Sequence, residues 1–160
     1  MTPSSDIVGI HATNLTHWML ERVPDLVEPL QFELITGGLS NLTYTVTDAS
    51  GRRWALRRPP LGHVLATAHD MGREVRIITA LSNTDVPVPP VVGFCDDVAV
   101  NEAPFYVMDF VDGVIARNTE AGSSLTVAAR ANAGRSLISV LATIHEIDVD
   151  AIGLGDIVRI

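Results

Sequence analysis

A carboxylate lies within the apolar face of a predicted helix at residues 63–81. Apolar residues recur there at steps of four and three, the period of one helical face: Val64, Ala68, Met71, Val75 and Ile78. Glu74 falls inside this face, and burying its charge is costly unless a cation meets it. Three interpretations are open: Glu74 reaches solvent, it pairs locally with Arg73 or Arg76, or it pairs with a cation of another element.

The strand-like segment before this helix offers such a cation. Over residues 52–58, alternation places Ala55 and Arg57 on one face and Trp54 on the other. Because the helix follows this strand, it can lay its acidic residue over one face, and Arg57–Glu74 is the natural pair. In phosphoryl-transfer enzymes such a pair holds a cation ready for phosphate. A purely structural salt bridge, or two solvated arginines, would be the alternative.

A glycine pair forms a third candidate feature, between the first two predicted strands. Gly37 and Gly38 permit positive φ and a close approach of the backbone to a ligand. Successive N–H groups in such a turn, which continues through Ser40 and Asn41, can face an anion. The segment matches neither the P-loop nor the dinucleotide-binding pattern. An ordinary hairpin turn is the alternative interpretation.

The elements that must position these residues follow from hydrophobic periodicity and turn residues. The pattern predicts helices at 13–23, 63–81 and 125–146, and strands at 30–36, 42–47, 52–58, 91–95 and 105–111. No helix separates the first three strands, which argues against a βαβ unit. We therefore expect an α+β fold with a five-stranded antiparallel sheet and one inserted helix.

Composition excludes several functional classes. The 160 residues carry a net charge of −8, and all 11 basic residues are arginines, so a general nucleic-acid binder is not expected. A single cysteine, Cys95, excludes an internal disulfide or a zinc cluster. The sequence shows no secretory signal and no run long enough to span a membrane. These features predict a cytoplasmic protein with no membrane or nucleic-acid partner.

The order of glycine turn, cation, carboxylate and two further strands resembles the N-terminal lobe of a protein-kinase-like fold. Trp54-Ala-Leu-Arg57 stands where kinases have Val-Ala-Ile-Lys. More closely, the sequence resembles the aminoglycoside phosphotransferase (choline kinase-like) family, in its branch associated with acyl-CoA dehydrogenases. Seven motifs in order carry the resemblance: Gly37–Tyr44, Leu56–Pro60, Ala68–Glu74, Val86–Pro89, Phe105–Gly113, Leu141–His145 and Gly153–Asp156.

The resemblance implies a domain organisation and a function. Residues 1–111 would form the N-terminal lobe with its N-terminal helix, 112–124 the hinge and linker, and 125–160 the start of a truncated C-terminal lobe. The implied function is ATP-dependent phosphorylation of the hydroxyl of a small molecule, such as an aminoglycoside or a hydroxyacyl compound.

The resemblance also assigns roles to residues. Gly37, Gly38, Ser40 and Asn41 would cover the ATP phosphates. Arg57 would replace the kinase lysine at the α- and β-phosphates, and Glu74 would orient it. For the base, Ala55 would pack on adenine, and the hinge at Met108, Asp109 and Val111 would hydrogen-bond its edge through the main chain.

One part of the family pattern is missing. The family carries a His-Gly-Asp catalytic loop and a magnesium-binding aspartate, and this sequence contains no His-Gly-Asp. We therefore expect little or no kinase activity from the isolated chain, and Mg²⁺ binding only if a second lobe is supplied. The last helix would then associate with a second copy or with a complementary C-lobe chain. A non-catalytic nucleotide-binding or interaction module is the alternative function.

Overall fold

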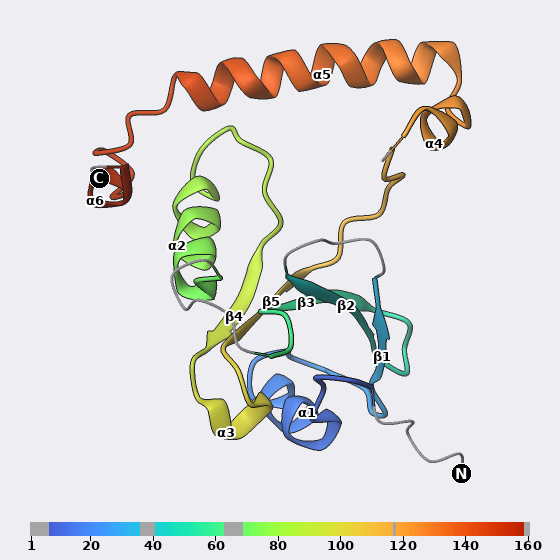
Figure 1. The fold of residues 1–160 in the computed structure, drawn as a ribbon, viewed down its shortest axis with the longest axis vertical. Helices are drawn as coiled ribbons and strands as arrows, with labels where there is room; N and C mark the ends of the chain where they lie inside the picture. The colour runs from blue at the N-terminus through green and yellow to red at the C-terminus, as the bar shows by residue number, and fades with distance from the viewer. Residues whose placement is uncertain (1–6, 36–40, 63–68, 117, 159–160) are drawn as a thin grey trace. The chain divides into compact units, whose positions relative to one another are not determined.

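The computed structural model describes residues 7–35, 41–62, 69–116 and 118–158. Within them the chain forms five strands and several helices, shown in Figure 1. The strands are β1 (Gln31–Leu34), β2 (Leu42–Thr47), β3 (Arg53–Arg58), β4 (Val91–Cys95) and β5 (Phe105–Asp109). The helices are α1 (Ala12–Leu20), α2 (Met71–Leu81), α3 (Val98–Asn101), α4 (Thr119–Ser123), α5 (Val127–His145) and α6 (Gly155–Val158).

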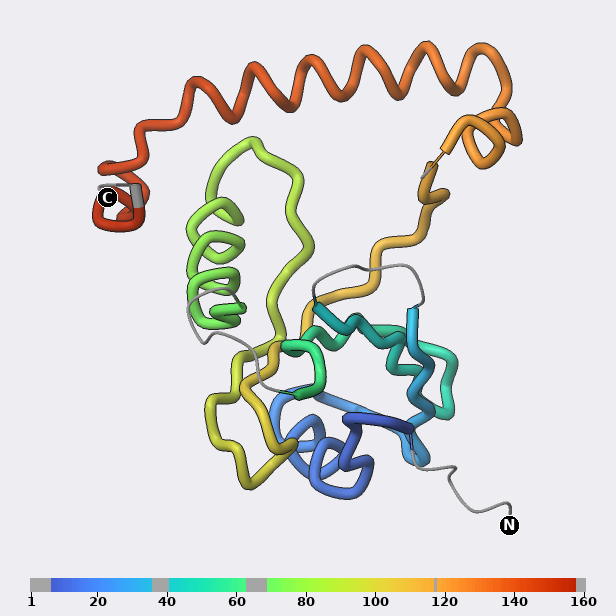
Figure 2. The backbone as a smooth tube through the Cα atoms, viewed as in Figure 1, coloured from blue at the N-terminus to red at the C-terminus, as the bar shows by residue number. Residues whose placement is uncertain are grey.

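All five strands belong to one antiparallel sheet in the order β1-β2-β3-β5-β4. The crossover places β5, which is last in sequence, directly beside β3, and α2 lies in the connection between β3 and β4 (Figure 2). The α+β class and the five-stranded antiparallel sheet with one inserted helix are therefore confirmed.

Alternation divides the sheet into two faces. Trp54 and Leu56 point with Phe105 and Val107 into the hydrophobic core, where α1 covers them. The rings of Trp18 and Phe105 meet edge to face, with centroids 5.0 Å apart. The residues between these core positions, including Arg57 and Tyr106, belong to the opposite face. The sheet thus separates its core from the candidate site.

Helix α2 starts later than the periodicity predicts. It begins at Met71, because the carboxylate of Asp70 accepts a hydrogen bond from the N–H of Arg73 at 2.9 Å, the arrangement of an N-cap. His69 and Asp70 precede the helix, and residues 63–68 lie outside the described part of the chain. Apolar periodicity alone does not mark a helix start, which depends on the capping side chain.

Other boundaries also differ from the predictions. Helix α1 and strands β1 and β5 are shorter than expected. Helix α3 was not predicted; Asp97 caps it by accepting a hydrogen bond from the N–H of Ala99 at 2.9 Å. Four-residue helices carry too few turns to show a period, so sequence patterns miss them.

The chain divides into two compact units, Met1–Thr79 with Pro89–Phe110 and Ala80–Val88 with Val111–Ile160. The first unit contains the sheet. In the second, α4 occupies part of the stretch that was expected to be a linker, and α5 is capped by Thr126. Within α5, Leu137 and Leu141 are exposed. No helix in the described residues is long and apolar enough to cross a membrane.

Candidate functional site

The site face of the sheet carries an ion pair between strand and helix. The Nε of Arg57 on β3 donates to the Oε2 of Glu74 on α2 at 2.9 Å. Both side chains are about two-thirds buried, with exposed fractions of 33% and 31%. The predicted Arg57–Glu74 pair is therefore present. A partly buried pair is less screened by solvent than one on an open surface.

Two further donors hold the same carboxylate. The hydroxyl of Tyr106 on β5 donates to Oε2 of Glu74 at 3.0 Å. The side-chain amide of Asn41, directly before β2, donates to Oε1 at 2.8 Å. Glu74 is thus bound by groups from three other segments, which settles the open interpretations in favour of a pair between elements.

Strand register explains why Tyr106 reaches the pair. Arg57 lies opposite Tyr106 across β3 and β5, and opposite Thr43 across β2 and β3. Directly opposed residues in antiparallel strands share a face. Sequence reasoning did not single out Tyr106, although its alternation with Phe105 and Val107 places it on the face away from the core.

The tyrosine stays a donor over the whole physiological pH range. Burial raises the pKa of Tyr106 far above its usual value, and the neighbouring Glu74 carboxylate raises it further. The hydroxyl therefore keeps its proton, and its hydrogen bond to Glu74 persists wherever the carboxylate is ionised.

A second residue missed by sequence reasoning is His69. Its Nδ1 lies 2.6 Å from the Oδ1 of Asn41. Since the Asn41 amide nitrogen faces Glu74, its oxygen faces the histidine, and His69 must carry a proton on Nδ1. The segment before α2 is thus tied to the start of β2.

The remaining predicted site residues are those expected to contact adenine or the phosphates. Ala55 is buried and lies opposite Met108, two positions along β3 from Arg57 on the same face. Asp109 ends β5, and its N–H donates to the carbonyl of Pro90 at 2.9 Å. Val111 belongs to the second unit and is exposed. Gly37, Gly38 and Ser40, which were predicted to contact the phosphates, lie outside the described residues.

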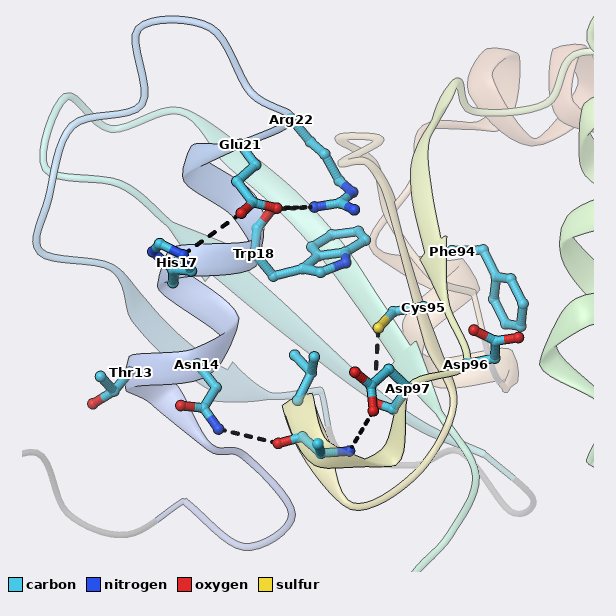
Figure 3. Close-up of a pocket in the computed structure, with 12 residues that line it drawn as sticks. Thr13, Asn14, His17, Trp18, Glu21, Arg22, Phe94, Cys95, Asp96 and Asp97 are labelled. Atoms are coloured by element: carbon cyan, nitrogen blue, oxygen red, sulfur yellow. Dashed lines mark hydrogen bonds and ion pairs between the residues drawn. The ribbon is translucent and has the colours of Figure 1, made fainter.

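A groove of about 720 Å³ lies at α1, α3 and strand β4, and sequence analysis did not predict it (Figure 3). Its one arginine, Arg22, lies over the ring of Trp18 at 4.2 Å and pairs with Glu21 at 2.9 Å. Asp96 and Asp97 also line it, so the groove offers an anion no unpaired cation. No group of three or more His, Cys, Asp or Glu suited to a metal ion occurs in the described residues.

An antiparallel five-stranded sheet, with a cation on β3 held by a carboxylate of the next helix, defines a kinase-like phosphotransferase fold. The sequence profile described as "Phosphotransferase enzyme family" matches residues 31–158, and the chain belongs to this family. The crystal structure described as "a putative aminoglycoside phosphotransferase" from Ralstonia eutropha superposes with a TM-score of 0.70 at 31% identity. That match covers 90% of this chain and 40% of the Ralstonia chain.

Two curated relatives carry a different name. Acyl-CoA dehydrogenase family member 10 of Mus musculus is 37% identical over 128 residues, covering 80% of this chain and 12% of the mouse protein. "Probable acyl-CoA dehydrogenase IBR3" of Arabidopsis thaliana is 38% identical over 133 residues, covering 79% of this chain and 16% of the plant protein. The chain therefore spans only a small part of the length of these relatives.

Proposed function

We propose that this chain supplies the nucleotide-phosphate site of an ATP-dependent phosphotransferase that acts on a small-molecule hydroxyl. The observation that carries the proposal is the Arg57–Glu74 ion pair between β3 and α2. Family membership supports phosphotransfer as the class of reaction.

Arg57 is the residue that would contact the phosphates. Glu74 occupies its Nε, while Nη1 and Nη2 make no hydrogen bond to any residue in the described part of the chain. Two parallel N–H groups match the oxygens of a phosphate, which a lysine ammonium would meet only as a point charge. The chain has a net charge of −8, which repels an anion, so binding of the ATP phosphates requires a local cation such as Arg57.

The base of ATP would lie along the same face. Ala55 and Met108 are opposed on β3 and β5, two positions from Arg57 and Tyr106. Ala55 carries only a methyl group, which would pack on the flat ring of adenine. Because the N–H of Asp109 is already donated to Pro90, any contact of Asp109 with adenine would use its carbonyl. Val111 remains a proposed main-chain contact on sequence grounds.

Gly37, Gly38 and Ser40 remain proposed phosphate contacts on sequence grounds. Asn41, which ends that segment, was predicted with them. Mg²⁺ normally accompanies ATP, but the described residues form no metal-binding group and we assign it no ligand here. The Ralstonia and acyl-CoA dehydrogenase relatives support an aminoglycoside or a hydroxyacyl compound as the acceptor class.

Calorimetric titration of the chain with ATP, with and without Mg²⁺, tests the proposal. We expect Arg57→Ala to weaken ATP binding by about tenfold or more, since it removes charge-assisted hydrogen bonds. Arg22→Ala is the matched control, because it removes one arginine from the same unit but from the groove at α1. Equal ATP affinity of Arg57→Ala and the parent would refute the role of Arg57.

Measurement of phosphate transfer distinguishes the proposed phosphotransferase from the alternative, a non-catalytic module. ATP binding without transfer to any hydroxyl acceptor would support a non-catalytic nucleotide-binding module. Absence of ATP binding by the folded parent chain would contradict both.

A further inference from the structure

We propose that Tyr106 and Asn41 are positioning residues that hold the Glu74 carboxylate so that Arg57 presents its Nη groups to the phosphates. This inference rests on the proposed function and deepens it at the same site. Neither residue was assigned this role by the family resemblance: Asn41 was expected at the phosphates and Tyr106 was not predicted at all.

The Arg57–Glu74 ion pair is a one-point contact. Arg57 meets Glu74 through a single N–H, its Nε, at 2.9 Å. A fork-to-fork pair would use two N–H groups and fix both planes, whereas a one-point contact leaves the carboxylate free to swing about it. Something else must therefore fix the carboxylate if the guanidinium is to keep one orientation.

Tyr106 and Asn41 supply that restraint from opposite sides. Tyr106 binds Oε2, the oxygen that also accepts from Arg57, and Asn41 binds Oε1. A carboxylate bound on both oxygens by groups of two different strand regions cannot rotate without breaking a hydrogen bond. The need is specific to arginine, because a planar guanidinium has a direction, which a lysine ammonium lacks.

The restraining groups are themselves held in place. Tyr106 is only 2% exposed and lies in β5, an interior strand between β3 and β4. Asn41 is 7% exposed, and its oxygen is engaged by Nδ1 of His69 at 2.6 Å. Because a carboxylate oxygen only accepts, the Asn41 amide turns its NH₂ group toward Glu74 and its oxygen toward His69.

The test uses Tyr106→Phe and Asn41→Ala in the full chain, with ATP as the probe in calorimetry. We expect each variant to bind ATP about three- to tenfold more weakly, the range for loss of one hydrogen bond at this site. Tyr44→Phe is the matched control. Tyr44 is fully buried on the core face, and its hydroxyl donates to the carbonyl of Val8 at 2.7 Å, so this variant should lower Tm but leave ATP affinity unchanged.

A double-variant comparison separates positioning from a merely structural role. In an Arg57→Ala background, Tyr106→Phe should cause no further loss of ATP affinity, because its effect acts through Arg57. Equal losses with and without Arg57, or ATP affinity unchanged by Tyr106→Phe and Asn41→Ala in folded protein, would overturn the proposal.

A second measurement needs no nucleotide. The water-exchange rate of the Arg57 Nε proton, assigned by NMR through its loss in Arg57→Lys, should rise about threefold or more in both variants and stay unchanged in Tyr44→Phe. If the parent fails to bind ATP, the proposed function fails, and this exchange rate alone decides the positioning role. An unchanged rate in both variants would then refute it.

Discussion

At the scale of single residues, Glu74 organises the candidate site. Its carboxylate joins Arg57, Tyr106 and Asn41, which come from separate parts of the sheet region. A buried carboxylate is stable only when its oxygens are satisfied, and here every partner is a donor. The cost of placing a charge inside an apolar helix face is thus offset by contacts that also hold Arg57, the residue proposed to meet phosphate.

Asp48, which lies away from the candidate site, is also a buried carboxylate whose oxygens are satisfied by donors. Its side chain is fully buried in the turn between β2 and β3. It accepts hydrogen bonds from the N–H groups of Ser50 and Arg52, both at 2.9 Å, and from Nε of Arg52 at 3.0 Å. Burial alone would raise the pKa of Asp48, but these hydrogen bonds outweigh it and lower the pKa well below its ordinary value.

This lowered pKa predicts a pH-dependent stability. A depressed folded-state pKa stabilises the protein above the unfolded value of about 4, and this contribution is lost as the pH falls toward the folded-state value. Asp48→Asn should therefore lower Tm by several degrees at pH 7, and the difference from the parent should shrink at about pH 3. Thermal unfolding followed by circular dichroism measures this. The exposed Asp85→Asn is the control, and a Tm gap for Asp48→Asn that is equal at both pH values would contradict the argument.

At the scale of elements, α1 and β4 approach each other at Gly93. A Cβ atom there would lie 3.0 Å from Cη2 and 3.2 Å from Cζ2 of Trp18. Trp18 cannot easily move, because it packs edge to face on Phe105 and carries Arg22 over its ring. The absence of a side chain at residue 93 thus sets how closely the helix packs on the sheet.

Gly93→Ala should consequently lower the free energy of unfolding by about 1–3 kcal/mol, the usual cost of overpacking a tight contact. Chemical denaturation with urea measures the change. Gly134→Ala in α5 is the matched control, since a Cβ there meets nothing within 4 Å and alanine favours the helix by about 1 kcal/mol. A Gly93→Ala variant as stable as the parent would show that α1 can shift without cost.

At the scale of the whole molecule, the two units differ in how many buried residues their main elements contain. Strands β2, β3 and β5 contribute buried residues to the core, whereas α5, the longest helix, has none. Most helical stability in proteins comes from packing an apolar face. The length of α5 is therefore no guide to its stability in this chain.

Amide hydrogen exchange should reveal this difference. We expect the amides of β3 and β5 to exchange at least about tenfold more slowly than those of α5, because strand amides open only with the core while α5 can unfold locally. Mass spectrometry of peptides from each element measures the rates in the free chain. Protection of α5 equal to that of β3 would mean that the helix is packed in solution.

The sequence by itself determined the main helices and strands and, within the candidate site, the Arg57–Glu74 pair. Period-two alternation assigns Arg57 and Ala55 to one strand face, and the helical period places Glu74 on the apolar face of α2, so their pairing could be predicted. Both signals are local, because each depends only on backbone geometry over a few residues. The α+β class followed from the order of these elements.

Only the tertiary structure decided the rest of the site. Tyr106 reaches Glu74 because β5 crosses over to lie beside β3, and no local pattern encodes which strands become neighbours. The Asn41–His69 contact likewise depends on where α2 begins, which Asp70 sets by capping the helix after the apolar period would have started it. Strand order arises from contacts between distant segments. The Asp70 cap is local, but apolar periodicity does not register it, and the contact of His69 with Asn41 joins segments far apart in the sequence.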